Sequence, residues 1–333
     1  ALPISSFIGG GTPSLLSGEQ IGQLMDRIRE QFAMAQDAEI TMEVNPGTAS
    51  AEKLRNFYTA GINRLSIGMQ SAQAEELKNL GRIHDFEGFC QVYREAVEAG
   101  FTNINVDIMS GLPGQTLASY RDTLEKVLHL EPMPQHISAY SLIVEEGTPF
   151  AAMAERGELP LPEEETERAM YEETIEVLSK YGFHRYEISN YARDGYECRH
   201  NVGYWIRRDY LGFGIGAASL IDNVRFQNEK SLGAYLAHPL ESREEEQTLT
   251  VQDRMEETMF LGLRLTRGVS CVDFAEQYGR TVEEVYGEVI ARNVADGLLT
   301  VTERKENQKK DRFLALTKRG LDLSNYVMAQ FLF

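Results

Sequence analysis

Glycine, carboxylate and carboxamide residues that could bind a polar ligand follow short apolar segments in the first third of the chain. Gly9–Gly11 ends the strand-like run Ile4–Ile8, and Glu43, Gln70 and Asp107 lie near the ends of three later runs. Glycine lets the backbone bend sharply or a ligand approach closely, whereas an ionised carboxylate only accepts hydrogen bonds. One such residue is typical of an ordinary turn. Several at equivalent places predict a single binding rim.

A second group could hold a metal centre. His200 is followed by Asn201, Tyr204 and Trp205, and Cys198 comes two residues before it. A neutral imidazole is a common metal ligand, and aromatic side chains can cover a flat ring. On its own, this spacing favours a core histidine beside two packing aromatics. Cys198 is a rival ligand, although an inert buried thiol is more typical.

The elements that must position these residues alternate between strand and helix. We expect strands at Ile4–Ile8, Glu39–Val44, Arg64–Met69, Asn103–Ile108, His136–Leu142 and His184–Ile188. Apolar residues at helical spacing predict a helix after most of these strands, including 72–80 and 85–99. This alternation predicts βαβ units and a parallel sheet, whose carboxyl ends meet at one edge.

The pattern changes near residue 240, which predicts two domains, 1–240 and 241–333. We expect a charged linker or helix start at Glu241–Gln247, a helix at Met255–Leu265, a capping box at Thr281–Glu284, a hairpin of Leu298–Thr302 with Phe313–Leu316, and a last helix at Lys318–Phe331. Helices followed by a small hairpin indicate a winged-helix-like domain. Its acidic context argues against DNA binding.

Composition limits the classes of partner. The 333 residues are 42% hydrophobic and 25% charged, as in ordinary globular proteins, and 51 acids against 33 bases give a formal net charge of −18. This charge argues against nucleic acid or an anionic membrane as the main partner. Cys90, Cys198 and Cys271 are far apart with no CxxC pair, which fits a reduced cytoplasmic setting.

The motifs together resemble a known family. They are Gly9-Gly10-Gly11-Thr12-Pro13-Ser14, Glu43-Val44-Asn45-Pro46, Arg64-Leu65-Ser66-Ile67-Gly68-Met69-Gln70-Ser71, Gly81-Arg82, Asn105-Val106-Asp107 and Gly111-Leu112-Pro113-Gly114-Gln115-Thr116. This set is similar to the radical S-adenosylmethionine (SAM) proteins of the anaerobic coproporphyrinogen oxidase superfamily. Glu187-Ile188-Ser189-Asn190-Tyr191-Ala192 and His200-Asn201-Val202-Gly203-Tyr204-Trp205 narrow the resemblance to the HemW branch of haem chaperones.

The resemblance assigns SAM contacts to Gly10, Gly11, Thr12, Glu43, Gln70, Arg82 and Asp107. It implies that the glycine turn meets the methionine moiety and that Glu43 and Asp107 accept from the ribose hydroxyls. Gln70 suits either the ribose or the carboxylate, and Arg82 would pair with the SAM carboxylate through a bidentate fork. Taken one at a time, the acids are better interpreted as helix caps and Arg82 as part of a surface salt bridge. Taken together with the glycines, the residues are better interpreted as a SAM site.

The resemblance also implies haem binding through His200, Asn201, Tyr204 and Trp205, with His200 on the iron and Asn201 orienting it. The implied partners are haem and acceptor haemoproteins, with peripheral membrane association through the acceptors. Haem transfer is a ligand exchange at iron and requires no catalytic acid or base. The alternative is an oxygen-independent coproporphyrinogen III oxidase of porphyrin biosynthesis, which performs a SAM-radical decarboxylation, and a SAM-binding module without activity is a third reading.

One family feature is missing. The CxxxCxxC loop that holds a [4Fe–4S] cluster precedes the glycine strand in this family, and none of the three cysteines here has that spacing. The resemblance therefore implies a partial (β/α)6-type barrel without its first βα unit, followed by the mostly helical domain. Either the N-terminal segment was removed or the chain is a remnant of the family, and the natural length of the family favours truncation.

Overall fold

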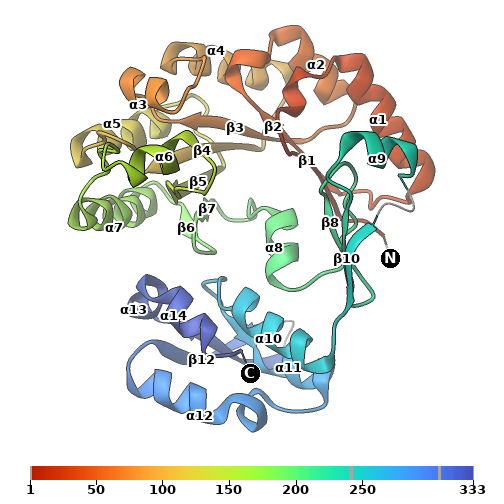
Figure 1. Cartoon of the computed structure of the whole chain (residues 1–333), viewed down its shortest axis with the longest axis vertical. Coiled ribbons are helices and arrows are strands. Elements are labelled where there is room, and N and C mark those ends of the chain that lie inside the picture. Colours follow the sequence, from red (N-terminus) through yellow and green to blue (C-terminus); the bar gives the residue numbers. More distant parts are fainter. Residues whose placement is uncertain (1, 240–242, 307–308, 333) are drawn as a thin grey trace. The chain divides into compact units, whose positions relative to one another are not determined.

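The computed structural model describes residues 2–239, 243–306 and 309–332 (Figure 1). The chain divides into two compact units, Ala1–His200 and Asn201–Phe333, and each is described by itself. The division falls between two adjacent residues of one short helix, whereas the sequence placed a domain boundary near residue 240. Residues 201–239 thus group with the C-terminal unit.

A seven-stranded sheet with the order β1-β2-β3-β4-β5-β7-β6 forms the centre of the N-terminal unit. Its first five strands are parallel, which confirms the predicted α/β class. The strands are β1 (Ser5–Ile8), β2 (Glu39–Val44), β3 (Arg64–Gln70), β4 (Ile104–Ser110), β5 (His136–Ser141), β6 (His184–Arg185) and β7 (Asn190–Ala192). The strand predicted at His184–Ile188 is wrong in length. The chain turns back after β6, and β7 pairs antiparallel with both β5 and β6.

Helices follow the parallel strands, and α1 (Gly18–Gln31), α2 (Ala51–Thr59), α4 (Phe86–Ala99) and α7 (Glu164–Lys180) line the outer side of the curved sheet in Figure 1. The other helices are α3 (Ala74–Asn79), α5 (Leu117–Leu128) and α6 (Pro149–Glu155), and α8 (Arg199–Trp205) comes after the antiparallel strand β7. Ser17 and Gln20 form the expected capping box of α1, since each side chain accepts from the other's backbone amide.

The two faces of the sheet differ in chemistry. Alternate strand residues such as Met42, Ile67 and Val106 are fully or almost fully buried in the core that the helices complete. The opposite set, which we call the polar face, comprises Thr41, Glu43, Arg64, Ser66, Asn105, Asp107, His136, Ser138 and Tyr140. The strand register places these residues on one side, because directly paired residues of parallel strands point the same way.

The C-terminal unit contains a small antiparallel sheet, β10-β9-β8, that the sequence did not predict. Its strands are β8 (Ala218–Ile221), β9 (Val224–Asn228) and β10 (Arg243–Thr248), and α9 (Leu232–Ala237) lies between the last two. The charged linker or helix start expected at Glu241–Gln247 is thus wrong for residues 243–247; residues 241 and 242 lie outside the described chain. Pairing with β9, and the Arg243 guanidinium 4.2 Å above the Phe226 ring, outweigh the low strand propensity of this acidic run.

The remainder of this unit is mostly helical with a hairpin, as predicted. It contains α10 (Val251–Gly262), β11 (Val269–Ser270), α11 (Cys271–Tyr278), α12 (Val282–Ala295), β12 (Leu299–Glu306), β13 (Lys309–Leu316), α13 (Lys318–Asp322) and α14 (Ser324–Ala329). The single last helix is corrected to two, because Leu323 has φ −112° and ψ 27°. None of the helices in the described ranges combines the length and the hydropathy that a bilayer crossing requires.

Candidate functional site

The glycine turn after β1 is open on the side where a ligand could approach. Gly10 and Gly11 have φ values of 78° and 71°, a left-handed conformation that favours glycine. A Cβ atom on either residue would meet no atom within 4 Å, so conformation rather than crowding requires glycine there. Gly9 is the crowded position, since its Cβ would lie 2.8 Å from Phe7 and 3.1 Å from the Glu43 carboxyl group.

Two carboxylates of the polar face lie near this turn. Glu43 Oε2 accepts from the Gly10 amide at 3.2 Å, and Asp107 Oδ1 accepts from Asn105 Nδ2 at 2.7 Å. Burial raises the pKa of Glu43, and the charge of Asp107 raises it further. Burial also raises the pKa of Asp107, although hydrogen bonds from Asn105 and Ser66 act in the opposite direction. The pair therefore favours a ligand that donates hydrogen bonds or carries positive charge.

Tyr140, which the sequence analysis missed, connects these carboxylates to Gln70. The Tyr140 hydroxyl donates to Gln70 Oε1 at 3.1 Å. Burial raises the pKa of Tyr140, with a further rise from Asp107 and Glu43 and an opposing effect of Arg82. The phenol is thus neutral, and the charges of Asp107, Glu43 and Arg82 all act on it. Its place near the carboxyl end of β5 follows the same rule that pointed to Glu43 and Asp107, so this signal was present in the sequence.

Gln70 and Arg82 reach the site by less regular backbone. Gln70 has φ 69° and sits at a register shift between β3 and β4, which turns its side chain over Gly68. Arg82 follows Gly81 directly after α3 and is half-buried. Within the described ranges its guanidinium makes no hydrogen bond or ion pair. The surface salt bridge considered for Arg82 is therefore absent among the described residues, and its charge is available to an anionic group.

Other residues of the motifs have structural contacts. Glu76 is 5% exposed, and its carboxylate accepts from Ser71 Oγ, Gln115 Nε2 and Ser119 Oγ at 2.6–3.0 Å. These bonds tie the turn after β3 to the loop after β4. Ser71 and Gln115 thus hold the loops of the rim rather than face a ligand.

The histidine–aromatic motif forms helix α8, which explains its spacing. His200 and Tyr204 are four residues apart, as are Asn201 and Trp205, so each pair shares a side of the helix. Adjacent residues such as His200 and Asn201 do not face each other on a helix. The orienting role of Asn201 therefore stays a prediction.

Glu39, a second residue that the sequence analysis missed, holds the start of α8. It is 7% exposed, and its carboxylate accepts from the Arg199 amide at 3.1 Å and from the His200 amide at 3.3 Å. The Cys198 thiol donates to the same carboxylate at 3.5 Å. A negative charge at a helix N-terminus is favourable because free amides and the helix dipole meet it there. No local pattern could reveal a pairing across some 160 residues.

The His200 ring lies against the N-terminal strand. It stacks on Phe7 with 5.0 Å between ring centroids and 25° between planes. Burial lowers the pKa of His200; the Glu39 charge opposes this effect and the Arg64 charge adds to it. A neutral imidazole is the form that binds iron. Cys198 is fully buried and directed toward Glu39, which makes it a poor rival ligand.

A chain of hydrogen bonds links the rim to the start of α8. Asn105 donates to Asp107 and its Oδ1 lies 2.6 Å from His136 Nδ1; His136 Nε2 lies 2.8 Å from the Tyr186 hydroxyl, which accepts from the Cys198 amide at 3.3 Å. Each donor finds an acceptor if His136 is neutral and protonated on Nδ1. Complete burial lowers the pKa of His136 far below its ordinary value, as this arrangement requires. The sequence analysis placed His136 only at the start of a strand.

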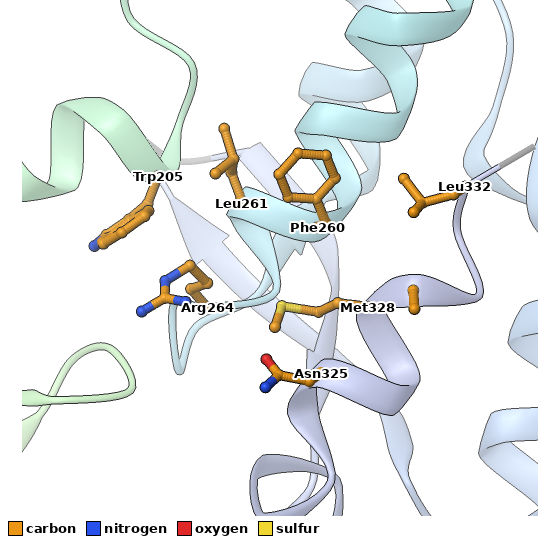
Figure 2. A pocket seen from close by; sticks show the side chains of 8 residues that line it. Trp205, Phe260, Leu261, Arg264, Asn325, Met328 and Leu332 are labelled. Carbon is orange, nitrogen blue, oxygen red and sulfur yellow. The ribbon is translucent and has the colours of Figure 1, made fainter. Parts of the chain in front are cut away.

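The aromatic end of α8 belongs to the C-terminal unit. Tyr204 packs edge-on against Tyr210 at 4.7 Å, and the Arg264 guanidinium lies 4.3 Å from the Trp205 ring centre. Trp205 and Arg264 lie on one side of an apolar pocket of about 320 Å³, and the Met328 thioether lies on another (Figure 2). An aromatic wall of this kind can cover an apolar ligand.

Comparisons with known proteins agree with these features. Residues 5–127 match the model of the Radical SAM superfamily, and residues 249–323 match the HemN C-terminal domain. The chain is 39% identical to "Heme chaperone HemW" of Bacillus subtilis over 98% of its own length and 84% of that protein.

The chain belongs to the HemW family. The protein of the same name from Escherichia coli is 36% identical over 88% of this chain and 77% of the relative. Among solved structures, Escherichia coli coproporphyrinogen III oxidase (HemN), described as a radical SAM enzyme, superposes with a TM-score of 0.80 and 25% identity. That match covers 98% of this chain and 77% of HemN.

The residues present do not fit a [4Fe–4S] cluster. Cys90 lies on α4, Cys198 precedes α8 and Cys271 begins α11, and none of the three forms a disulfide within the described ranges. Nowhere in the described ranges do three or more histidine, cysteine, aspartate or glutamate side chains gather so that they could hold a metal ion. The glycine turn, the carboxylate pair and Arg82 do fit SAM, because they offer backbone amides, acceptors and a free cation.

Proposed function

We propose that this protein binds haem at α8, with His200 as an axial ligand, and delivers the haem to acceptor haemoproteins in the cytoplasm. HemW relatives carry the name of heme chaperones, and the chain contains the histidine–aromatic motif on one short helix. The acceptors bind iron with their own ligands, so transfer is a ligand exchange. Any membrane association is peripheral and comes from the acceptors.

The observation that carries this proposal is the way His200 is held. Its backbone amide is fixed by Glu39, its ring stacks on Phe7, and its imidazole is neutral. Glu39 thus fixes the start of the helix and Phe7 fixes the ring, so that the imidazole is held in one position. Because the ring remains partly exposed, a haem bound there can be exchanged.

Titration of ferric haem into the purified chain tests the proposal. We expect one haem per chain with a shifted Soret band, and at least tenfold weaker binding with a different spectrum for His200→Ala. Thermal melts of both proteins without haem distinguish a ligand from a packing residue. An identical spectrum and affinity in the variant would contradict the assignment to His200.

SAM is the second ligand that the site supports. We infer that the Gly10–Thr12 turn meets the methionine moiety, Glu43 and Asp107 meet the ribose hydroxyls, Gln70 assists, and Arg82 binds the carboxylate. Bound SAM supplies a sulfonium that can be cleaved reductively when a cluster is present; the residues here bind and orient it. Arg82→Met should weaken SAM binding about tenfold in calorimetry, the cost of one charged hydrogen bond. Unchanged affinity would contradict this role.

Coproporphyrinogen oxidation is the alternative reaction. It is favoured by the HemN-like fold, but the relatives at 36–39% identity are named heme chaperones, and HemN is 25% identical. Incubation with coproporphyrinogen III, SAM and a reductant, after supply of a cluster-binding segment, separates the two. Haem binding without porphyrin turnover is the outcome that the proposal predicts.

A further inference from the structure

Arg64 is a buried positive charge with no anionic partner among the described residues. It begins β3, belongs to the polar face and is 2% exposed. Its Nη1 atom lies 3.5 Å from Thr41 Oγ1, the outer limit of a hydrogen bond, and its Nε atom is buried without a partner. Across the described ranges no carboxylate oxygen comes within 4.0 Å of this guanidinium. A buried ion without partners is costly, and an anion bound beside Arg64 would remove that cost.

The groups around Arg64 do not supply that anion. Glu39, a possible partner, has its carboxylate engaged by the start of α8. Asp107 is close enough for Arg64 to affect its pKa, after the larger effect of burial, but not close enough for an ion pair. The other groups whose pKa the Arg64 charge affects are His136, Tyr186 and His200. A histidine does not become an anion, and burial raises the pKa of Tyr186, so none of them supplies a negative charge.

The register of the sheet connects Arg64 to His200. Phe7 pairs with Thr41, and Thr41 pairs with Arg64, so these three side chains form one row on the polar face. His200 stacks on Phe7 at one end of the row, and Arg64 lies at the other end, two strand spacings or about 10 Å from Phe7 across the sheet. This separation is comparable with that between the iron of a haem and its propionate edge.

We propose that Arg64 binds a propionate carboxylate of the haem whose iron His200 ligates. The proposal rests on the proposed function, because it requires haem at His200. A guanidinium and a carboxylate form a bidentate, charge-assisted pair that is strong where water is excluded. Since Arg64 is covered without ligand, haem binding must displace part of this cover, and the ion pair then removes the cost of the isolated charge.

The test compares haem with its dimethyl ester, in which both propionates are neutral. Both are titrated, in the same detergent, into the wild-type chain, Arg64→Met and Arg199→Met. Arg199 is the matched control, because it is next to His200 in sequence but pairs with Asp37 at the surface. We expect wild type and Arg199→Met to bind haem at least tenfold more tightly than the ester. Arg64→Met should bind the two equally, with the affinity of wild type for the ester.

Further measurements separate the remaining outcomes. Without ligand, Arg64→Met should melt at or above the wild-type temperature, because an uncompensated buried charge has been removed. If Arg64→Met does not fold, Arg64→Lys, which keeps the charge without the fork, should show a reduced preference for haem over the ester. A wild type that binds neither compound would refute the proposed function itself.

One result would overturn the assignment of Arg64 while leaving haem binding intact: an Arg64→Met protein that keeps the wild-type preference for haem over the ester. If that protein also binds SAM more weakly, Arg64 is assigned to the carboxylate of SAM instead. We expect SAM affinity to be equal in both proteins.

Discussion

The rim at the carboxyl ends of β2 to β5 and the start of α8 lie in the same unit but are held in place differently. Strand register places Glu43, Asp107 and Tyr140 on one face, so the backbone of the sheet determines that they are near each other. The start of α8 depends on side chains far away in sequence, chiefly Glu39 and Tyr186. The rim should therefore tolerate side-chain substitutions structurally, whereas α8 should not.

Replacing Glu39 tests this difference most severely. Glu39→Ala leaves the Arg199 and His200 amides without their acceptor, and we expect a loss of on the order of 3 kcal/mol in the free energy of unfolding. Haem binding should weaken as well, because His200 loses its fixed position. Urea unfolding followed by circular dichroism measures the first effect, and haem titration the second.

Asp37→Asn is the control for Glu39. Asp37 also contacts Arg199, at 3.1 Å, but both side chains are exposed, and a surface ion pair contributes about 0.5 kcal/mol or less. If the two variants lose similar stability, the start of α8 is not held by the buried carboxylate.

Removing one hydroxyl group from the buried series of hydrogen bonds should lower the stability less than Glu39→Ala does. Tyr186→Phe leaves His136 Nε2 and the Cys198 amide without a partner, which should cost about 1–2 kcal/mol in the free energy of unfolding. Tyr181→Phe, at an exposed tyrosine after α7, should be neutral. Equal stabilities of the two variants would show that the hydrogen bonds between Asn105, His136, Tyr186 and Cys198 do not stabilise the fold.

The rim should show the smallest effect, visible as a dependence on pH. The pKa of Asp107 is raised in the folded protein, so the native state binds the proton more tightly than the unfolded chain. Stability should decline as pH rises from the ordinary aspartate pKa of about 4 to the raised folded-state pKa, and stay level above it. Asp107→Asn should remove part of this decline in urea melts from pH 4 to 8.

Asp253 provides a comparison of opposite sign. Backbone hydrogen bonding at the start of α10 lowers its pKa, so its contribution is present above pH 4 and is lost as the pH falls. Asp253→Asn should therefore reduce the loss of stability that occurs as the pH falls below about 4. Asp107→Asn should leave that loss unchanged. A pH profile of Asp107→Asn identical to that of wild type would contradict the buried, destabilised carboxylate.

The same difference explains what the sequence could predict. Alternating apolar segments predicted the strands of the parallel sheet, because a strand has a local periodicity that the sequence shows. Glu43 and Asp107 were predicted to lie near each other because the carboxyl ends of parallel strands meet at one edge. Tyr140 followed the same rule and was overlooked. The roles of Glu39 and Tyr186 and the formation of β10 depend on contacts with other segments, which no single stretch of sequence contains. The hairpin of β6 and β7 was missed because its strands are too short to show a period.

The central claim is that His200 ligates haem iron, and imidazole rescue of His200→Gly tests it most directly. The cavity left by the side chain can admit free imidazole beside Phe7. We predict that the variant binds haem with an altered Soret band and that added imidazole restores the wild-type spectrum with a saturable dependence on concentration. A wild-type spectrum in the variant without imidazole would contradict the claim.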